Sequence, residues 1–280
     1  MPTAGHGWRY VSPLLVFTTL FFVVPFAFIL VTSTWARIDG TIVRTWNLDH
    51  YVEFATTPHL RVALWNSLGI TATVTLVSVL LAYPFAWIIA MRVPARWQRL
   101  ALILAIVPFW TSYVIRSYAW LLVLAKNGIL NKALMGLHLI ETPFEIAATR
   151  IATVTGFVHF FVMLLTLTIY ANLKQLSPNY ARAAADLGAG PIATFRHVIL
   201  PLSLPGIVVG AFLTFVLCVG DYITPQILGG GNELVLPQVI MMQIGRRADI
   251  PTAAALSVIL MAVVTLAYLA CARWLKLERA

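Results

Sequence analysis

Apolar residues form six long runs along the chain, and the stretches between these runs carry most of the charged side chains. A helix needs about 20 apolar residues to cross a hydrocarbon core of roughly 30 Å, and the runs are about that long. We therefore predict six transmembrane helices. In chain order they cover about 11–33, 64–91, 100–121, 151–170, 204–223 and 252–272.

Composition supports a membrane protein, because 60% of the 280 residues are hydrophobic and only 10% are charged. These values exclude a water-soluble fold. We expect an all-α, polytopic protein in which residues 1–280 form a single transmembrane domain in contact with lipid. The formal charge of +9 comes from residues spread along the chain, so it does not indicate nucleic-acid binding. The first run is longer than a signal-peptide core, which predicts a retained anchor.

Basic residues between the runs predict the orientation. Six spans place both termini on the same side of the membrane. If that side is the cytosol, the inner segments hold ten Lys and Arg residues, whereas the outer segments, which contain more residues in total, hold eight. The positive-inside rule therefore favours cytoplasmic N- and C-termini.

The inner segment between the fourth and fifth runs, about 174–202, contains the stretch SPNYARAAADLGAGPIATFRHVILP. Ser177 is suited to cap a helix that begins at Pro178, and Gly188 is suited to the left-handed residue that ends it. A second short helix would begin at Pro191, and we expect Pro201 and Pro205 to end it and turn the chain into the fifth span. One face of this second helix would hold Ile192, Phe195 and Ile199.

Two interpretations of this helix pair differ in what it contacts. Periodicity alone is compatible with an amphipathic helix that lies against lipid headgroups. The alanines of the first helix, however, bury too little apolar area to hold a membrane surface. Docking of a soluble partner on the cytoplasmic side accounts better for the small side chains.

The same stretch resembles the cytoplasmic EAA loop of binding-protein-dependent ABC permeases, in which a coupling helix inserts into a groove of the ATPase subunit. The residues that match the family pattern are Ala183, Ala184, Asp186, Leu187, Gly188, Phe195, Leu200 and Pro201. Arg182 departs from it, since the family usually has Glu there. The resemblance implies that Arg182 and these matching residues contact or position the ATPase, and the reversed charge at Arg182 puts the usual electrostatic contact in doubt.

Further segments narrow the resemblance to spermidine/putrescine-type permeases. They are YPFAWIIA from Tyr83, VPFWTSYVIRSYAWLLVL from Val107, KNGILNKALMGLHLIETPFEI from Lys126 and GDYITPQILGG from Gly220. The resemblance implies a type I ABC importer permease fold in the bacterial inner membrane. It also implies two ABC ATPase subunits, a second and usually different permease chain, and a periplasmic or surface-tethered binding protein. The cargo it suggests is a polyamine, or else another small solute such as an opine or an amino-acid derivative.

Candidate transport residues gather near the outer ends of the third and fifth runs. Asp221 is the only carboxylate inside an apolar run, and an intramembrane charge indicates function. Together with aromatic faces it could receive a cation that passes through the membrane. The aromatic candidates are Trp110, Tyr113, Tyr118 and Trp120, which surround Arg116, and Tyr222, which follows Asp221. Alternatively, Asp221 and Arg116 pair with each other or reach lipid headgroups.

Catalytic and metal-binding motifs are absent from the sequence. There is no GxxxxGK[ST] loop for ATP, and no CxxC, HExxH or GxSxG pattern. We therefore expect no catalysis, cofactor or metal, and energy supplied by another subunit. A secondary transporter or a membrane scaffold subunit is the alternative class, although no internal repeat of the kind common in such transporters is evident.

Overall fold

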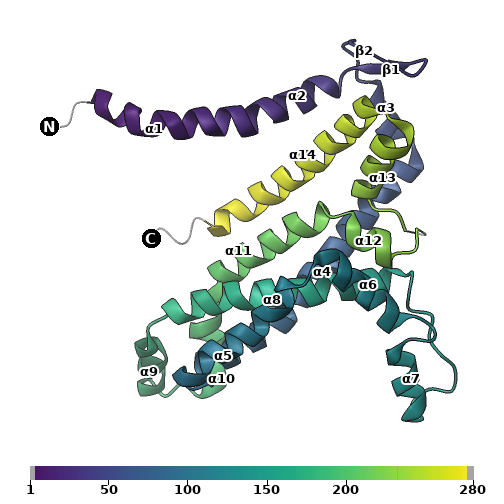
Figure 1. Cartoon of the computed structure of the whole chain (residues 1–280). Coiled ribbons are helices and arrows are strands. Elements are labelled where there is room, and N and C mark those ends of the chain that lie inside the picture. The colour runs from purple at the N-terminus through teal and green to yellow at the C-terminus, as the bar shows by residue number, and fades with distance from the viewer. Residues whose placement is uncertain (1–3, 232, 276–280) are drawn as a thin grey trace. The chain divides into compact units, whose positions relative to one another are not determined.

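The computed structural model describes residues 4–231 and 233–275 and is mostly helical, as predicted (Figure 1). It contains two compact units. Of the described residues, the first unit combines 4–62 with 236–263, and the second combines 63–231 and 233–235 with 264–275. Two long helices, α4 (Pro58–Met91) and α14 (Ile250–Leu275), begin in the first unit and continue in the second.

The first unit holds a β-hairpin that the all-helical prediction missed. Its strands pair antiparallel, with Ile38 opposite Thr41. Asp39 and Gly40 form the turn with positive φ angles of 50° and 80°, which is the backbone that an Asp-Gly pair favours in a two-residue hairpin. Besides the beginnings of α4 and α14, the unit contains α1 (Ala4–Thr18), a π-helical turn (Thr19–Val23), α2 (Val24–Thr32), β1 (Ala36–Ile38), β2 (Thr41–Val43), α3 (Asp49–Thr56), α13 (Leu236–Met242) and a π-helical turn (Gln243–Arg247).

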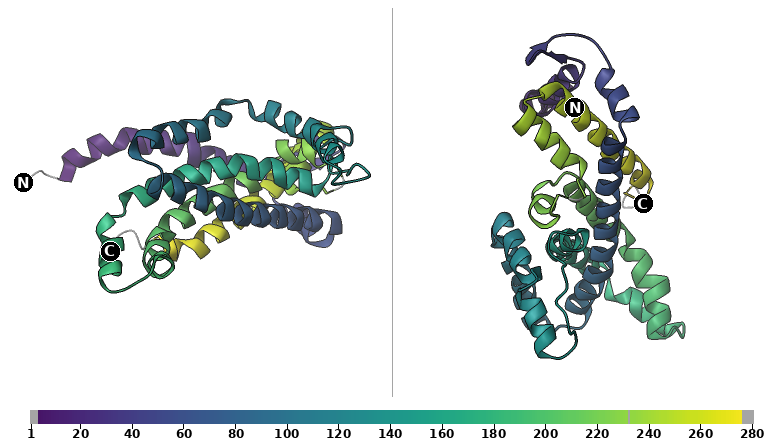
Figure 2. Two further views of the ribbon diagram at one scale, coloured as in Figure 1. Left: turned by 90° about the horizontal axis from the view of Figure 1, so that it is seen from below. Right: turned by 90° about the vertical axis from the view of Figure 1, so that its right-hand side faces the viewer.

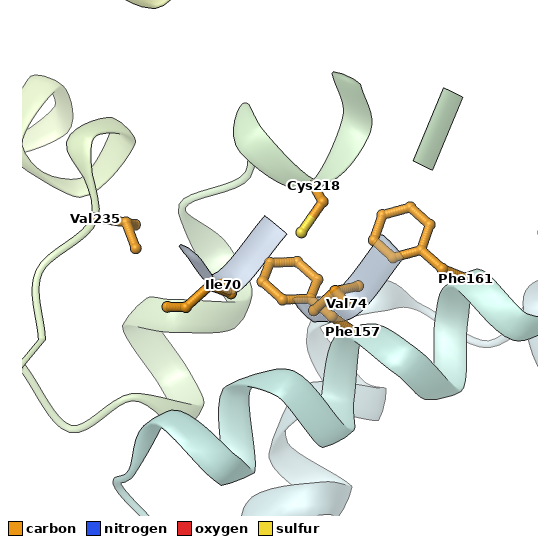
Figure 3. Packing of buried hydrophobic residues seen from close by; sticks show 6 residues of the cluster. All are labelled: Ile70, Val74, Phe157, Phe161, Cys218 and Val235. Atoms are coloured by element: carbon orange, nitrogen blue, oxygen red, sulfur yellow. The ribbon is translucent and has the colours of Figure 1, made fainter. Parts of the chain in front are cut away.

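The second unit is built around α8 (Arg150–Gln175). Phe157 and Phe161 of α8 point toward Ile70 and Val74 of α4 and toward Cys218 of α11 (Figure 3). The other elements of the unit are α5 (Ala95–Ile106), a 3-10 turn (Val107–Trp110), α6 (Tyr113–Leu124), α7 (Ile129–Gly136), α9 (Pro178–Asp186), α10 (Pro191–Thr194), a π-helical turn (Phe195–Ile199), α11 (Leu200–Val219) and α12 (Ile223–Leu228).

Small residues let α11 approach α8 closely, and the two helices lie side by side in both Figure 1 and Figure 2. A Cβ atom added at Gly206 would lie 2.5 Å from the side chain of Asn172, and one added at Gly210 would lie 2.7 Å from Leu165. Small residues at such crossings are typical of packed membrane helices, where backbones approach each other for van der Waals contact. We conclude that α11 is firmly seated on α8.

Among the described residues, five helical paths are long and apolar enough to cross a membrane, and each overlaps a predicted run. They are Val11–Thr32, Pro58–Met91, Arg150–Gln175, Pro191–Val219 and Ile250–Ala272. The third predicted span differs, because it is not one straight helix. Ala95–Trp110 and Tyr113–Gly136 meet at an angle of 90°. The backbone at Thr111 and Ser112 is extended and Pro108 lies in the preceding 3-10 turn, so the helix stops there and restarts in a new direction.

The prediction that Pro201 and Pro205 end a second short helix is wrong. Helical structure continues from Pro191 through a π-helical turn into α11, and both prolines lie within it. In the π turn the N–H of Leu200 bonds to the carbonyl of Phe195, five residues back. This wider turn directly precedes Pro201 and moves the carbonyls that a proline ring would otherwise meet. The fifth span consequently begins earlier than predicted and ends at Val219, before Asp221.

Candidate coupling segment and transport path

The first helix of the predicted coupling segment, α9, begins and ends where the sequence indicated. The Ser177 side chain accepts a hydrogen bond from the N–H of Asn179 at 3.3 Å, and Pro178 is the first helical residue. Gly188 has a left-handed φ of +81°. The hinge conformation that we expected at this glycine is therefore present.

Two backbone hydrogen bonds close the end of α9. The N–H of Gly188 donates to the carbonyl of Ala185, and the N–H of Ala189 donates to the carbonyl of Ala184, both at 2.9 Å. This pair of bonds is the Schellman motif, which needs a left-handed residue at the position of Gly188. The motif fixes the direction in which the chain leaves α9 and enters α10.

The tip of the segment exposes apolar side chains. Leu187 is 89% exposed and Ile192 is 82% exposed. The predicted residues Arg182, Ala183, Asp186 and Gly188 are exposed as well, whereas Ala184 is buried. Two large apolar side chains beside charged and small residues form a surface suited to docking another protein.

Two other predicted coupling residues do not belong to this tip. Phe195 is half-buried and packs edge-on against Tyr83 and Trp87 of α4, with ring centroids 5.8 Å and 6.2 Å away. Pro201 lies within the continuing helix, directly after the π turn. The coupling segment thus has an outward-facing tip and an inward-facing base.

In the candidate transport path, Asp221 acts as a hydrogen-bond acceptor at the start of α12. Its carboxylate accepts the N–H of Ile223 at 2.8 Å and the N–H of Thr224 at 3.4 Å. It also accepts the hydroxyl of Tyr113, which in turn contacts the hydroxyl of Thr224. Asp221 therefore joins α6 to α12, and its charge lies where helix N–H groups favour an anion.

Arg116 is buried, with 7% of its surface exposed, and forms no ion pair with Asp221 in the part of the chain that the structure describes. Its guanidinium donates to the carbonyl of Pro108 at 3.1 Å. The same group lies 4.7 Å from the ring centroid of Phe160 and 5.4 Å from that of Tyr113. The charge of Arg116 is thus stabilised by cation–π contacts with two rings instead of by an ion pair with Asp221.

The other aromatic candidates do not join this cluster. Trp110 and Tyr118 are exposed, and Tyr222 is half-buried. Trp120 instead donates its indole N–H to Nδ1 of His159 at 3.1 Å. In the structure Tyr113 contacts both Arg116 and Asp221, so these three candidates form one cluster. The remaining candidates lie outside it.

Phe160 and Thr224 are site residues that we did not predict. Phe160 stacks on Phe109 with centroids 4.8 Å apart and meets Tyr113 edge-on. In the sequence it stands in an ordinary apolar run, so nothing there distinguishes it from its neighbours. Thr224 follows Asp221 by three residues, a spacing that could have indicated a capped helix. Within residues 4–231 and 233–275, no group of three His, Cys, Asp or Glu side chains could hold a metal ion.

Comparison with known proteins assigns the family. Residues 2–277 match the protein family described as binding-protein-dependent transport system inner membrane component. The chain belongs to this family. The match covers nearly the whole chain, so it includes the coupling segment and the path residues alike.

Curated members of the transport family share substantial identity with the chain. The spermidine/putrescine transport system permease protein PotB of Escherichia coli (strain K12) is 34% identical over 242 residues, which cover 86% of this chain and 87% of PotB. PotB of Haemophilus influenzae is 29% identical over 275 residues, covering 96% and 95%. The molybdenum transport system permease protein ModB of Mycobacterium bovis is 28% identical over 271 residues, covering 96% and 94%.

Solved structures show the fold of the family. A bacterial ABC transporter involved in the import of alginate matches with a TM-score of 0.75 at 14% identity, covering 98% of this chain and 96% of that one. The MetNI methionine ABC transporter matches with a TM-score of 0.59 at 17% identity, covering 78% and 95%. The chain has the type I ABC importer permease fold and is an inner membrane transport subunit rather than an enzyme. ATP hydrolysis belongs to separate ATPase subunits.

Proposed function

We propose that this chain is the permease subunit of an ATP-driven importer that moves polyamines across the bacterial inner membrane. The observation that carries the proposal is its 34% identity to a spermidine/putrescine permease over 86% of the chain. The secondary-transporter and scaffold alternatives lack such support. Whether the cargo is a polyamine or another small solute, such as an opine or an amino-acid derivative, is the point that the experiment below decides.

The proposed assembly contains two ATPase subunits, a second and different permease chain, and a binding protein outside the membrane. A solved relative supports the last partner, because the bacterial alginate transporter has been crystallised in complex with a periplasmic protein. We place the N- and C-termini in the cytosol, as the basic residues favour. This orientation puts α9 and α10 on the side where an ATPase hydrolyses ATP.

The exposed tip supports docking to the ATPase. Burial of Leu187 and Ile192 in a groove of the ATPase would remove apolar surface from water, which is favourable for each side chain by about 1.5–3 kcal/mol. The residues that we assign to this docking surface are Arg182, Ala183, Asp186, Leu187, Gly188 and Ile192. Closure of the ATPase dimer would then displace the tip and move the spans between inward-open and outward-open states.

In the candidate transport path, we assign contact with the cargo to the cluster around Tyr113 and Asp221. A polyamine carries ammonium groups that lose water on the way through, and a carboxylate offsets part of that cost. Arg116 lies against the rings of Tyr113 and Phe160, and cation–π contacts with these rings stabilise its charge. Trp110 and Tyr118 are exposed and remain candidates for the same path.

Uptake measurements test the proposed cargo. The chain, its ATPase, the second permease and the binding protein would be expressed together in cells that lack their own polyamine uptake. We expect uptake of radiolabelled spermidine or putrescine that requires the ATPase, with an ATPase variant lacking its Walker lysine as the control. Competition by an unlabelled opine or amino-acid derivative, with none by unlabelled spermidine, would refute the polyamine assignment.

A further inference from the structure

The base of the coupling segment contacts the second span through the side chain of Phe195. Phe195 is the first residue of the π turn, and its ring meets the edges of Tyr83 and Trp87, one turn apart on α4. The sequence comparison with the EAA loop put Phe195 among residues that serve the ATPase. In the structure its side chain instead faces into the permease.

Trp87 depends on ring contacts for its position. Its indole Nε1 is buried and has no hydrogen-bond acceptor among the residues that the structure describes. One neighbour of the indole is Phe195, and another is the guanidinium of Arg92, 5.4 Å from the ring centroid. Beside these rings lies a cavity of about 410 Å³, lined in part by Pro84, Ile192 and Phe195. The cavity leaves open space beside Pro84, into which this part of α4 can move.

Pro84 interrupts the backbone hydrogen bonding of α4 in this part of the second span. It lies between Tyr83 and Trp87, inside the long helix. A proline inside a helix lacks an N–H group, so one backbone hydrogen bond of the helix is missing and bending there costs less than elsewhere. Phe195 therefore contacts α4 at residues on both sides of Pro84.

The π turn separates the movable tip from a fixed helix. Beyond it, Gly206 and Gly210 hold α11 tightly against α8, and the hydroxyl of Ser203 lies 3.0 Å from that of Tyr83. A π turn has a wider and weaker hydrogen-bond pattern than an α-helix, and such turns often mark functional sites. Displacement of α9 and α10 would consequently carry Phe195 with it and be taken up in the rest of the π turn, while α11 stays on α8.

We propose that Phe195 is a positioning residue that transmits displacement of the coupling tip to α4, bending the second span at Pro84 through contact with Tyr83 and Trp87. This inference rests on the proposed function, because it takes an ATPase as the source of the displacement. It does not depend on the identity of the cargo. It assigns docking to Leu187 and Ile192 and transmission to Phe195.

Paired nitroxide labels on α4 test the transmission directly. Leu80→Cys and Ile88→Cys would carry the labels, since both side chains are exposed and lie on either side of Pro84. In the reconstituted complex we expect ATP to change the distance between the labels. With Phe195→Ala the ATPase should remain bound while the distance no longer changes. An unchanged distance in the otherwise wild-type complex, or equal changes in both complexes, would overturn the inference.

Transport per ATP gives a second test with matched variants. Phe195→Ala should lower spermidine uptake per ATP hydrolysed about tenfold, within the usual range of coupling free energies, and Phe195→Tyr should restore it because the ring remains. Ile192→Ala, at the exposed tip, should lower ATPase binding but leave the ratio unchanged in complexes that assemble. Loss of the ATPase from the Phe195→Ala complex would make Phe195 a docking residue and refute the inference.

Trp87→Leu removes the receiving ring without breaking a hydrogen bond. We expect it to reproduce the defect of Phe195→Ala, and the double variant to be no worse than either single one. Additive defects would show that Phe195 does not act through Trp87. If wild-type vesicles hydrolyse ATP without taking up spermidine, the proposed cargo is wrong, and the label distances still decide the role of Phe195.

Discussion

Substitution of Gly188 tests whether the left-handed backbone conformation that ends α9 is needed for coupling. Its φ is +81°, and no atom lies within 4 Å of the place where a Cβ would be added. The cost of Gly188→Ala is therefore conformational rather than a steric clash with neighbouring residues, at about 1–2 kcal/mol for an L-residue in the left-handed region. That free energy corresponds to about a 5- to 30-fold smaller population of the native turn. Gly188→Val should cost more, because branched side chains avoid this region.

Gly190 supplies the matched control. It stands two residues later, also has open space around its would-be Cβ, and has a φ of −69° that any residue adopts. We expect Gly190→Ala to behave nearly like wild type, whereas Gly188→Asn should be the mildest change at 188, since Asn tolerates the left-handed region.

The assay for this series is co-purification of the ATPase together with stimulation of its activity by loaded binding protein. Gly188→Val should reduce both while membrane abundance stays normal, because the spans themselves do not depend on the hinge. Wild-type assembly and stimulation with Gly188→Val, or an equal defect with Gly190→Ala, would refute the role of the left-handed turn.

Three further variants test other features. Arg182→Glu should weaken assembly with the ATPase even though it restores the usual family residue, because the groove must match the charge that this chain presents; equal or better transport would contradict this. Gly206→Ala places a Cβ 2.5 Å from Asn172 and should lower the unfolding free energy in detergent by about 1–3 kcal/mol, while Gly136→Ala, with no atom within 4 Å, should not. Asp221→Asn keeps an acceptor for the amides of α12 but removes the charge, so we expect lower uptake at normal abundance; normal uptake would leave Asp221 only a helix cap.

Features set by neighbouring residues in the chain could be predicted from the sequence. The cap at Ser177, the start at Pro178 and the left-handed turn at Gly188 all follow from local backbone rules, and the structure has each of them. Except for the third, the long apolar runs likewise correspond to long helices. Local rules suffice there because the decisive hydrogen bonds join residues fewer than six positions apart.

Features set by distant contacts could not be predicted in the same way. The sequence places Phe195 on an apolar face of a short helix, but only packing against α4 shows that this face turns inward. The bend at Thr111 and Ser112 was also missed, since the apolar run continues across it. Hydropathy measures whether a segment prefers lipid and carries no information on whether its helix is continuous.

Prolines show most clearly why composition does not decide helix continuity. Pro84 and Pro205 lie inside helices, Pro201 follows a π turn, and Pro108 stands just before a break. Each of these prolines lacks a backbone N–H. Whether the helix continues therefore depends on how the backbone accommodates the carbonyl that loses its donor. At Pro201 the preceding turn widens and the helix goes on.

At the break, a charged side chain stabilises the interrupted backbone. The guanidinium of Arg116, on the second half of the broken span, donates to the carbonyl of Pro108 on the first half. The ring of Phe160 stacks on Phe109 from the first half and lies against Arg116 from the second. A buried cation without a carboxylate partner would ordinarily be destabilising, but here it donates to a main-chain carbonyl at the break, which also accepts the N–H of Thr111, and it contacts two aromatic faces. Arg116 is thus explained by the bend itself, so the cargo contact that we propose in this cluster falls to Asp221, whose carboxylate also accepts the hydroxyl of Tyr113 and two N–H groups of α12.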